Sequence, residues 1–550
     1  MSLLLGLPPE PEGNEPRVLL LTLHPPPNCL RNISCGKAAN GVRDQTGYET
    51  KRGTRPNGVR DQTGYETFLT ALGPKIKQYG LGRDATNYSV HERGADGAFD
   101  MRIGGVMSQA PRSLVLFNYD WDADCFSALK GDYPHDSAGF DLFSFPSNAR
   151  LAAFDLERFV GRLARQAKRR HWRAVVSNHE QFGALGAAML AERMGWPGTP
   201  VEAVLACQHK LYAREVLEQV CPEANIRFAL LDAEYGAPAP QGLQYPLFVK
   251  PVKAAFSVLA RTVNSRADLH AHTRFGIWEL WVIRRLVEPF ERVARARLAQ
   301  AGSAHRMLVE EPVHARQYNL DGYVWNGRVH EIGYVDSIMY PGTQSFMRFD
   351  TPSRLDAAAR ARARDIAQRF LAAVNFTHGA FNMEFFHDES SGRMAVIEFN
   401  PRLASQFSDM YRRVAGKDPH ELAFWLAHGR DPAGMPERVA AFGVAASFVY
   451  RTFPGCSAPP MPTRSQVARL EARFPDAMLL TFPKDAVQIA RDYKWLGSYR
   501  HGILHLGGRD AADLRARCEE ASRILGWVPP YGAYHRQSAS VMPSGVPVIA

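Results

Sequence analysis

The spacing of apolar segments changes between residues 195 and 245, and this change limits the folds that the chain can adopt. Before it, short apolar runs alternate with helical patterns, as in 173–200, where a strand and a turn lead into an Ala-rich helix. After it, apolar runs follow one another with two helical interruptions, at 278–300 and 354–374. The alternation predicts a parallel sheet flanked by helices, so we expect a multidomain chain with an α/β part followed by α+β parts.

The same patterns assign individual strands and helices. The apolar run 16–24 predicts the first, buried strand of the parallel layer. Asn326-Gly327 stands between two apolar runs in 317–338 and predicts a β-hairpin. Further strands are expected at 113–121, 245–252, 256–263, 305–313, 393–401 and 501–508, and further helices at 151–170, 207–219 and 510–527.

One segment, NGVRDQTGYET, occurs twice, at 40–50 and at 57–67. A solenoid needs several units that each bury a neighbour, and two polar, Gly-rich copies cannot do so. We therefore interpret 40–67 as a duplicated, exposed loop.

Composition narrows the class of protein. Apolar residues make up 45% of the 550 residues and charged residues 22%, which is typical of globular chains. The net charge of +10 is small for this length and no basic tail with interleaved aromatic residues occurs, so we expect no nucleic-acid partner. The absence of an uninterrupted apolar run of about 18 residues predicts no membrane span. Seven cysteines without CxxC spacing favour a reducing, cytoplasmic location without a disulfide framework or zinc site.

Candidate metal ligands lie in two neighbouring predicted strands on either side of a polar turn. Glu398, Asn400 and Arg402 are spaced two residues apart, so in an extended chain they point to one face, where Glu384 of the preceding strand can join them. Two carboxylates and an amide oxygen form an all-oxygen site that suits Mg²⁺ better than Zn²⁺. Arg402 suits an anionic substrate or intermediate. The alternative is a solvated hairpin face with ordinary salt bridges.

Two lysines precede these acids in the chain. Lys210 lies near the start of a predicted helix, where the helix dipole also favours anions, and Lys250 ends a predicted strand. At about 4 Å and an effective dielectric constant near 20, each would attract a unit phosphate charge by roughly 4 kcal/mol. Alone, either lysine could equally be a solvated surface group. The segment LVEEPV (308–313) then runs from an apolar strand into two acids.

In this order, the pieces resemble the pattern of the ATP-grasp superfamily over roughly residues 200–430, from Lys210 through VKP and E-E-x-V to E…E-x-N-x-R. The resemblance, to the carboxylate–amine ligases and the biotin carboxylase-like branch, implies three domains. They are a Rossmann-like N-terminal domain (1–195), a two-lobed ATP-grasp domain (196–430) and a small C-terminal α+β domain with a tail (431–550). The last could form a lid, a substrate wall or the surface of a homodimer.

The resemblance also implies roles for the site residues. Lys210 and Lys250 would hold the α- and β-phosphates of ATP, and Arg402 would act with Lys250 beside the transferred phosphoryl group. The ligands of Mg²⁺, or of Mn²⁺ in its place, would be Glu384, Glu398 and Asn400. The nucleotide's adenine and ribose would be contacted by Glu310, Glu311, Val313 and Gln317.

Two positions depart from the family's pattern. Gln317 stands where an acid usually grips the ribose. A neutral hydrogen bond contributes about 0.5–1.5 kcal/mol and a charged one about 1.5–3, so we expect nucleotide binding to weaken about tenfold at most. The loop that follows the VKP lysine carries Ala254 and Ala255, where the family usually has glycines. Positive φ is costly at these positions, and Lys253 could supply compensating charge.

The expected function is that of an ATP- and Mg²⁺-dependent ligase. It would phosphorylate a carboxylate to an acyl phosphate and condense it with an amine, releasing ADP and phosphate; its partners would be these two small-molecule substrates. One alternative is a biotin- or carbamoyl-type carboxylase, which would need a separate carrier because no AMKM-like segment is present. The other is an ATP-binding protein without turnover.

Overall fold

The computed structural model describes residues 2–6, 18–22, 111–142, 147–234, 242–255 and 258–531. The chain divides into two compact units, 1–104 and 105–550. In the first unit, β1 (Ser2–Gly6) pairs antiparallel with β2 (Val18–Thr22) in a two-stranded sheet. The strand predicted at 16–24 is therefore present, but the expectation that it starts a parallel layer is wrong, because its partner runs antiparallel. The duplicated segment 40–67 lies outside the described residues.

The second unit begins with a small parallel sheet. Its strands are β3 (Arg112–Leu116), β4 (His135–Ala138) and β5 (Trp172–Val176), in the order β4-β3-β5. The strand predicted at 113–121 ends early because Phe117 adopts a φ of 53° and turns the chain toward the next helix. The helices of this region are α2 (Asp120–Ala128), α3 (Leu156–Arg170), α4 (Gly183–Met194), α5 (Val201–Gln208) and α6 (Lys210–Val220).

A four-stranded antiparallel sheet follows, which we call the small lobe. Its order is β6-β9-β7-β8. The strands are β6 (Phe228–Glu234), β7 (Leu247–Pro251), β8 (Arg261–Val263) and β9 (Arg306–Glu310). Two helices, α7 (Arg266–Thr273) and α8 (Ile277–Arg297), lie between β8 and β9 in the chain. The strands predicted at 245–252 and 305–313 and the helix predicted at 278–300 are thus confirmed, whereas the strand predicted at 256–263 is present only at its end, as β8.

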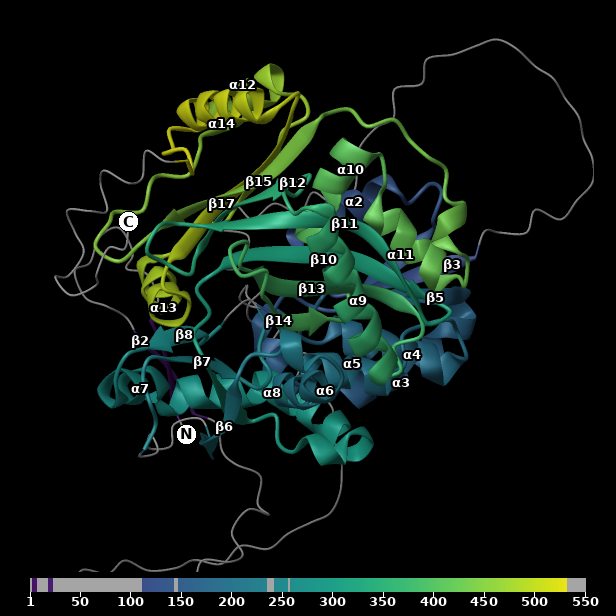
Figure 1. Ribbon diagram of the computed structural model, residues 1–550, viewed down its shortest axis with the longest axis vertical. Helices are drawn as coiled ribbons and strands as arrows, with labels where there is room; N and C mark the ends of the chain where they lie inside the picture. Colours follow the sequence, from purple (N-terminus) through teal and green to yellow (C-terminus); the bar gives the residue numbers. More distant parts are fainter. Residues whose placement is uncertain are drawn as a thin grey trace, which may run out of the picture. The chain divides into compact units, whose positions relative to one another are not determined.

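An eight-stranded antiparallel sheet, which we call the large sheet, occupies most of the remaining chain (Figure 1). Its order is β14-β13-β10-β11-β12-β15-β17-β16. The strands are β10 (Arg316–Trp325), β11 (Arg328–Met339), β12 (Phe346–Thr351), β13 (Gly379–His387), β14 (Met394–Asn400), β15 (Val444–Thr452), β16 (Met478–Thr481) and β17 (Tyr499–Gly508). The helices are α9 (Ala357–Ala373), α10 (Ser408–Ala415), α11 (Pro419–Ala427), α12 (Arg464–Arg473), α13 (Ala486–Leu496) and α14 (Ala511–Leu525). Because β15 pairs directly with β12, the large sheet contains strands from both sides of residue 430, where a domain boundary was expected. That boundary and the one at 195 stay predictions.

The predicted hairpin is confirmed at the turn between β10 and β11. Asn326 and Gly327 have φ values of 50° and 75°, both in the left-handed region. Two positive φ values in a two-residue loop match the twist of the flanking strands, which is why Asn-Gly is favoured there.

The two faces of the large sheet differ in chemistry. Leu320 of β10 belongs to the same core as Phe370 and Leu371 of α9, and Phe370 stacks on Phe399 of β14 with ring centroids 4.0 Å apart. Neighbouring side chains on a strand point to opposite faces, so Asp321 points away from α9. It accepts a hydrogen bond of 2.8 Å from the Tyr411 hydroxyl of α10. The face under α9 is therefore an apolar core, and the other face carries buried polar groups beside a second apolar cluster with α10 and α11. Among the described residues, no helix combines the length and hydropathy that crossing a membrane requires.

Replacing Gly333 by Ala tests how closely α10 packs on β11. A Cβ at Gly333 would lie 2.4 Å from Cε1 of Tyr411, which is buried and cannot retreat easily. Overpacking of this kind costs about 1–3 kcal/mol, so thermal unfolding should show a clear loss of stability. The control is Gly131→Ala, whose Cβ would have nothing within 4 Å. Equal melting temperatures for the two variants would contradict the packing described.

Candidate functional site

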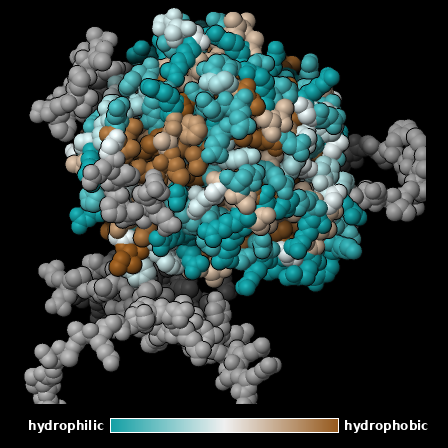
Figure 2. Space-filling model, turned by 60° about the horizontal axis from the view of Figure 1, so that its bottom comes forward, coloured by the Kyte–Doolittle hydropathy of each residue, from teal (hydrophilic) through white to brown (hydrophobic). Residues whose placement is uncertain are grey.

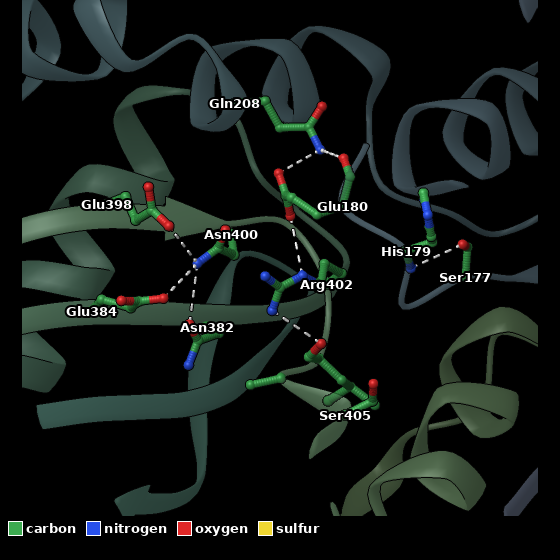
Figure 3. A network of polar contacts seen from close by, with 12 residues as sticks. Ser177, His179, Glu180, Gln208, Asn382, Glu384, Glu398, Asn400, Arg402 and Ser405 are labelled. Atoms are coloured by element: carbon green, nitrogen blue, oxygen red, sulfur yellow. Dashed lines mark hydrogen bonds and ion pairs between the residues drawn. The ribbon is translucent and has the colours of Figure 1, made fainter. Parts of the chain in front are cut away.

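Two carboxylates from neighbouring strands face each other on the polar face of the large sheet (Figure 3). Glu384 of β13 is the register partner of Glu398 of β14, and Asn382 is the partner of Asn400. The Asn400 side-chain nitrogen lies 3.4 Å from a carboxylate oxygen of each acid. Gln317 of β10 donates a 2.9 Å hydrogen bond to the second oxygen of Glu384. The structure thus brings these predicted side chains together, as the two-residue spacing indicated.

The pKa values of the two acids shift in opposite directions because their surroundings differ. Burial raises the pKa of Glu384, and the nearby charge of Glu398 raises it further. Burial acts in the same direction on Glu398, but Lys210 and Lys250 outweigh it and hold the pKa of that carboxyl below its ordinary value. A carboxylate pair of this kind is stabilised by any cation placed between its members.

The donor set fits Mg²⁺. Glu384 and Glu398 provide carboxylate oxygens, and Mg²⁺ is usually held by one or two carboxylates together with substrate phosphates. Asn400 turns its side-chain nitrogen toward both acids here, so it would offer its amide oxygen only after the amide group rotates. In the part of the chain that the structure describes, no group of three or more His, Cys, Asp and Glu side chains is arranged to hold a metal. The set therefore suits an ion whose coordination is completed by phosphate oxygens better than an ion that is coordinated by protein side chains alone.

Lys210 and Lys250 approach the acid pair from two elements. Lys210 is the first residue of α6, and its ammonium lies 3.1 Å from Glu398 and donates a 3.0 Å hydrogen bond to the Ala254 carbonyl. Lys250 of β7 lies 2.9 Å from Glu310 and 3.3 Å from the Ile397 carbonyl, next to Glu398 in β14. Both lysines therefore lie where the small lobe meets β14.

A buried ion pair fixes that junction. Arg214 of α6 lies 2.6 Å from Glu310 at the end of β9, and both side chains are almost fully buried. The same guanidinium donates to the carbonyls of Val396 (2.6 Å) and Ile397 (3.0 Å) in β14. Burial would raise the pKa of Glu310, but Arg214 and Lys250 outweigh it and lower that pKa. Arg214 thus joins α6, β9 and β14, a role that the sequence analysis missed.

Arg402 meets an acid from the parallel-sheet region. Its Nε lies 3.0 Å from Glu180, which follows β5 (Figure 3). Glu180 also accepts a 2.8 Å hydrogen bond from Gln208 and lies 3.5 Å from the Lys253 ammonium. The sequence analysis missed Glu180, although a polar run directly after a strand of a parallel sheet is a recognisable signal for a binding residue.

The cluster as a whole has more positive than negative side chains. It combines Lys210, Lys250, Lys253, Arg214 and Arg402 with Glu180, Glu310, Glu384 and Glu398. An excess of positive charge in a poorly solvated site favours an anionic ligand.

Comparison with known families identifies this region. Residues 243–409, which contain Lys250, Glu310, both facing acids and Arg402, match the family described as ATP-grasp domain. The chain contains an ATP-grasp domain. Lys210, Arg214 and Glu180 precede the matched residues and complete its site from α6 and from the loop after β5.

Individual relatives of the chain cover more than the ATP-grasp domain. Carnosine synthase 1 of Gallus gallus is 26% identical over 267 residues, 46% of this chain and 27% of that protein. An uncharacterized protein of Sinorhizobium fredii, y4rH, is also 26% identical, over 46% of this chain and 48% of that protein. The match thus spans less than half of either curated relative. The crystal structure of an L-amino acid ligase from Bacillus licheniformis is 15% identical, with a TM-score of 0.55 over 75% of this chain and 97% of that chain, and this likeness shows the fold.

The remaining predicted residues of the ATP-grasp domain lie at the edge of the cluster. Glu311 is 2.7 Å from Arg227 and 2.7 Å from Arg393, outside the buried charges, and half-buried Val313 lies between β9 and β10. The Glu310 carboxylate faces Arg214 and Lys250, so contacts of these residues with adenine stay predictions.

The consecutive acids Glu310 and Glu311 each pair with an arginine, one buried and one exposed, so that replacing each arginine tests the buried ion pair. Arg214→Met removes the main partner of buried Glu310 and leaves two carbonyls without their donor, which should cost about 3–5 kcal/mol of folding free energy. Arg227→Met removes the partner of Glu311, and since the Arg227 side chain is 88% exposed, the change should stay within about 0.5 kcal/mol. Urea unfolding measures both. Similar midpoints would show that Arg214 does not hold the junction.

Proposed function

We propose that the protein is an ATP-dependent ligase that activates a carboxylate by phosphorylation and joins it to an amine. The observation that carries the proposal is the position of two lysines at the junction of the two sheets. Lys210 lies 3.1 Å from Glu398 of the Glu384–Glu398 pair, and Lys250 lies 3.3 Å from the carbonyl of the preceding residue, Ile397. An ATP-grasp domain supports nucleotide binding there. The similarity to a carnosine synthase and to an L-amino acid ligase supports ligation and makes amino acids the first substrates to examine.

Different residues would bind different parts of the nucleotide's phosphate chain and its metal ion. Lys210 and Lys250 would hold the α- and β-phosphates, and Glu384, Glu398 and Asn400 would hold Mg²⁺ or Mn²⁺. A metal ion bound there would neutralise phosphate charge and orient the phosphate oxygens.

Arg402 would stabilise charge at the end of the cleft where the phosphoryl group is transferred. Burial would lower the pKa of its guanidinium, but the charges of Glu180 and of the two facing acids outweigh it and raise that pKa. Phosphoryl transfer between like-charged groups depends mainly on positioning and charge neutralisation, which fixed cations supply without reorganisation.

The proposed reaction has two balanced steps. A carboxylate oxygen attacks the γ-phosphorus of ATP, the bond to the β-phosphate oxygen breaks, and ADP leaves. The amine nitrogen then attacks the acyl carbon, phosphate leaves with the bonding electron pair, and the nitrogen loses a proton. The buried cluster would favour the acyl phosphate over hydrolysis by keeping water away from it.

The flanking regions complete the proposal. We infer that the parallel sheet β4-β3-β5 belongs to a Rossmann-like domain that supplies Glu180 to the site, and that residues 431–531 form an accessory region continuous with the large sheet. A cytoplasmic location and a homodimer remain our expectations.

An assay of ADP release tests the activity. Purified protein with MgATP is screened against amino acids singly and in pairs, with bicarbonate as a separate arm. Release of ADP and phosphate that requires both a carboxylate and an amine, with a condensed product in the mass spectrum, is the expected result. Dependence on bicarbonate instead would support a carboxylase, and nucleotide binding without turnover would support an inactive binding protein.

A pair of isosteric changes in one hairpin tests the metal site. Glu398→Gln removes a metal ligand and the partner of Lys210, so ADP release should fall by at least about 10³-fold, the scale of losing a key electrostatic contact. Glu389→Gln, in the exposed turn between β13 and β14, should leave the rate unchanged within about twofold. Circular dichroism checks that both variants are folded. An active Glu398→Gln enzyme would remove Glu398 from the metal site.

A further inference from the structure

The loop between β7 and β8, here called the phosphate loop (residues 252–260), is fastened to its surroundings at several points. Of its residues, 252–255 and 258–260 are described. The Val252 carbonyl accepts a 3.1 Å hydrogen bond from the Lys210 amide, and the Ala254 carbonyl accepts from the Lys210 ammonium. The Leu259 amide donates to the Trp495 carbonyl at the end of α13. Hydrogen bonds thus hold the described residues Val252, Ala254 and Leu259 to α6 and to the end of α13.

Lys253 is the most deeply buried anchor of the phosphate loop. Its side chain is 1% exposed. The ammonium lies 3.5 Å from the Glu180 carboxylate and donates a 3.3 Å hydrogen bond to the Glu180 carbonyl. It also lies 5.1 Å from the centre of the Phe290 ring of α8. A lysine buried without partners would lose its charge, so Glu180 is what keeps this position compatible with an ammonium.

Glu180 connects Lys253 to Arg402. One carboxylate oxygen faces Lys253 and accepts from Gln208, and the other lies 3.0 Å from Arg402. Figure 3 shows Glu180 between Gln208 and Arg402, with Glu384 and Glu398 beyond Arg402. One buried acid is thus shared by a cation from the phosphate loop and a cation from the end of β14.

The burial of Lys253 decides between two roles that it could have, namely direct contact with a phosphate and an effect through Glu180. A side chain that is 1% exposed and covered by Glu180 does not reach a phosphate in the cleft without breaking its own ion pair. Lys210 is 14% exposed and Arg402 is 16% exposed, so these two can contact a ligand directly. Lys250, 4% exposed and paired with Glu310, would have to leave that partner to do so. Lys253 therefore acts through Glu180.

We propose that Lys253 is a positioning residue: through Glu180 it ties the phosphate loop to Arg402, so that the loop and the phosphoryl-transfer end of the cleft are held as one unit. The catalytic part of this inference rests on the proposed ligase function. The tether offsets the absence of glycine at Ala254 and Ala255, because it holds the loop near the phosphates instead of letting main-chain amides close over them.

Hydrogen–deuterium exchange of the full chain without nucleotide tests the tether itself. Lys253→Met should raise amide exchange by about tenfold or more in the phosphate loop and in 178–182, since both ends of the ion pair are released. Glu180→Gln should raise exchange in the same two segments, and it serves as the second variant if Lys253→Met fails to fold. Lys130→Met, at an exposed lysine, is the control. Unchanged exchange in folded Lys253→Met or Glu180→Gln protein would overturn the proposal.

Steady-state kinetics separate positioning from phosphate binding. In Lys253→Met we expect kcat for ADP release to fall about tenfold or more while the KM for ATP and the Kd for Mg²⁺–AMPPNP stay within about threefold. A large rise in Kd with kcat unchanged would make Lys253 a phosphate ligand and overturn the assignment. The double variant Lys253→Met/Glu180→Gln should be about as slow as the slower single variant, because both changes break one tether. If the wild-type chain neither binds AMPPNP nor releases ADP, the proposed function fails, and the exchange experiment still decides the tether.

Discussion

The removal of charged side chains from water is the constraint on which the rest of this structure depends. Arg214, Glu310 and Lys250 are almost fully buried, and each would be unstable there alone. Their attraction requires α6, β7 and β9 to meet at one point, and the bonds from Arg214 to two carbonyls add β14 to that point. The fold therefore has a buried cluster of ion pairs where the small lobe meets the large sheet, which is also where we propose that a nucleotide binds.

The charges at this junction stabilise one another only because cations and carboxylates lie side by side. The same arrangement explains why the junction suits a phosphate. Glu398 stays ionised because Lys210 and Lys250 face it, whereas the pKa of Glu384 is raised. A polyphosphate with a divalent cation would supply negative charge to the lysines and positive charge to the acids at the same time. Folding has thus already placed the charges close together, so a nucleotide can bind with little reorganisation of the side chains.

Local patterns were sufficient to predict much of this site. The alternation of side chains along a strand placed Glu398 and Asn400 on one face, and antiparallel pairing across a short turn brought Glu384 opposite, as expected for a hairpin. The Asn326-Gly327 turn was predictable because few other dipeptides accept two positive φ values. Such features depend on residues that are close together in the sequence, so one sequence is enough to predict them.

What the sequence could not reveal depends on contacts between distant segments. Arg214 resembles any helical arginine until β9 and β14 close around it, and Glu180 is one polar residue in a run of several. The pairing of β15 with β12 likewise depends on which edge of the sheet is free, so the continuation of the large sheet through residue 430 could not be read from hydropathy. The strand β2 was found, but its partner was not, because apolar runs do not encode strand direction.

A crystal structure of the full chain with Mg²⁺ and AMPPNP is the most direct measurement of the central claim. The account predicts phosphate oxygens within hydrogen-bonding distance of Lys210 and Lys250, with a metal ion shared between the phosphates, Glu384 and Glu398. A nucleotide bound elsewhere, or one whose phosphates point away from this carboxylate pair, would contradict it.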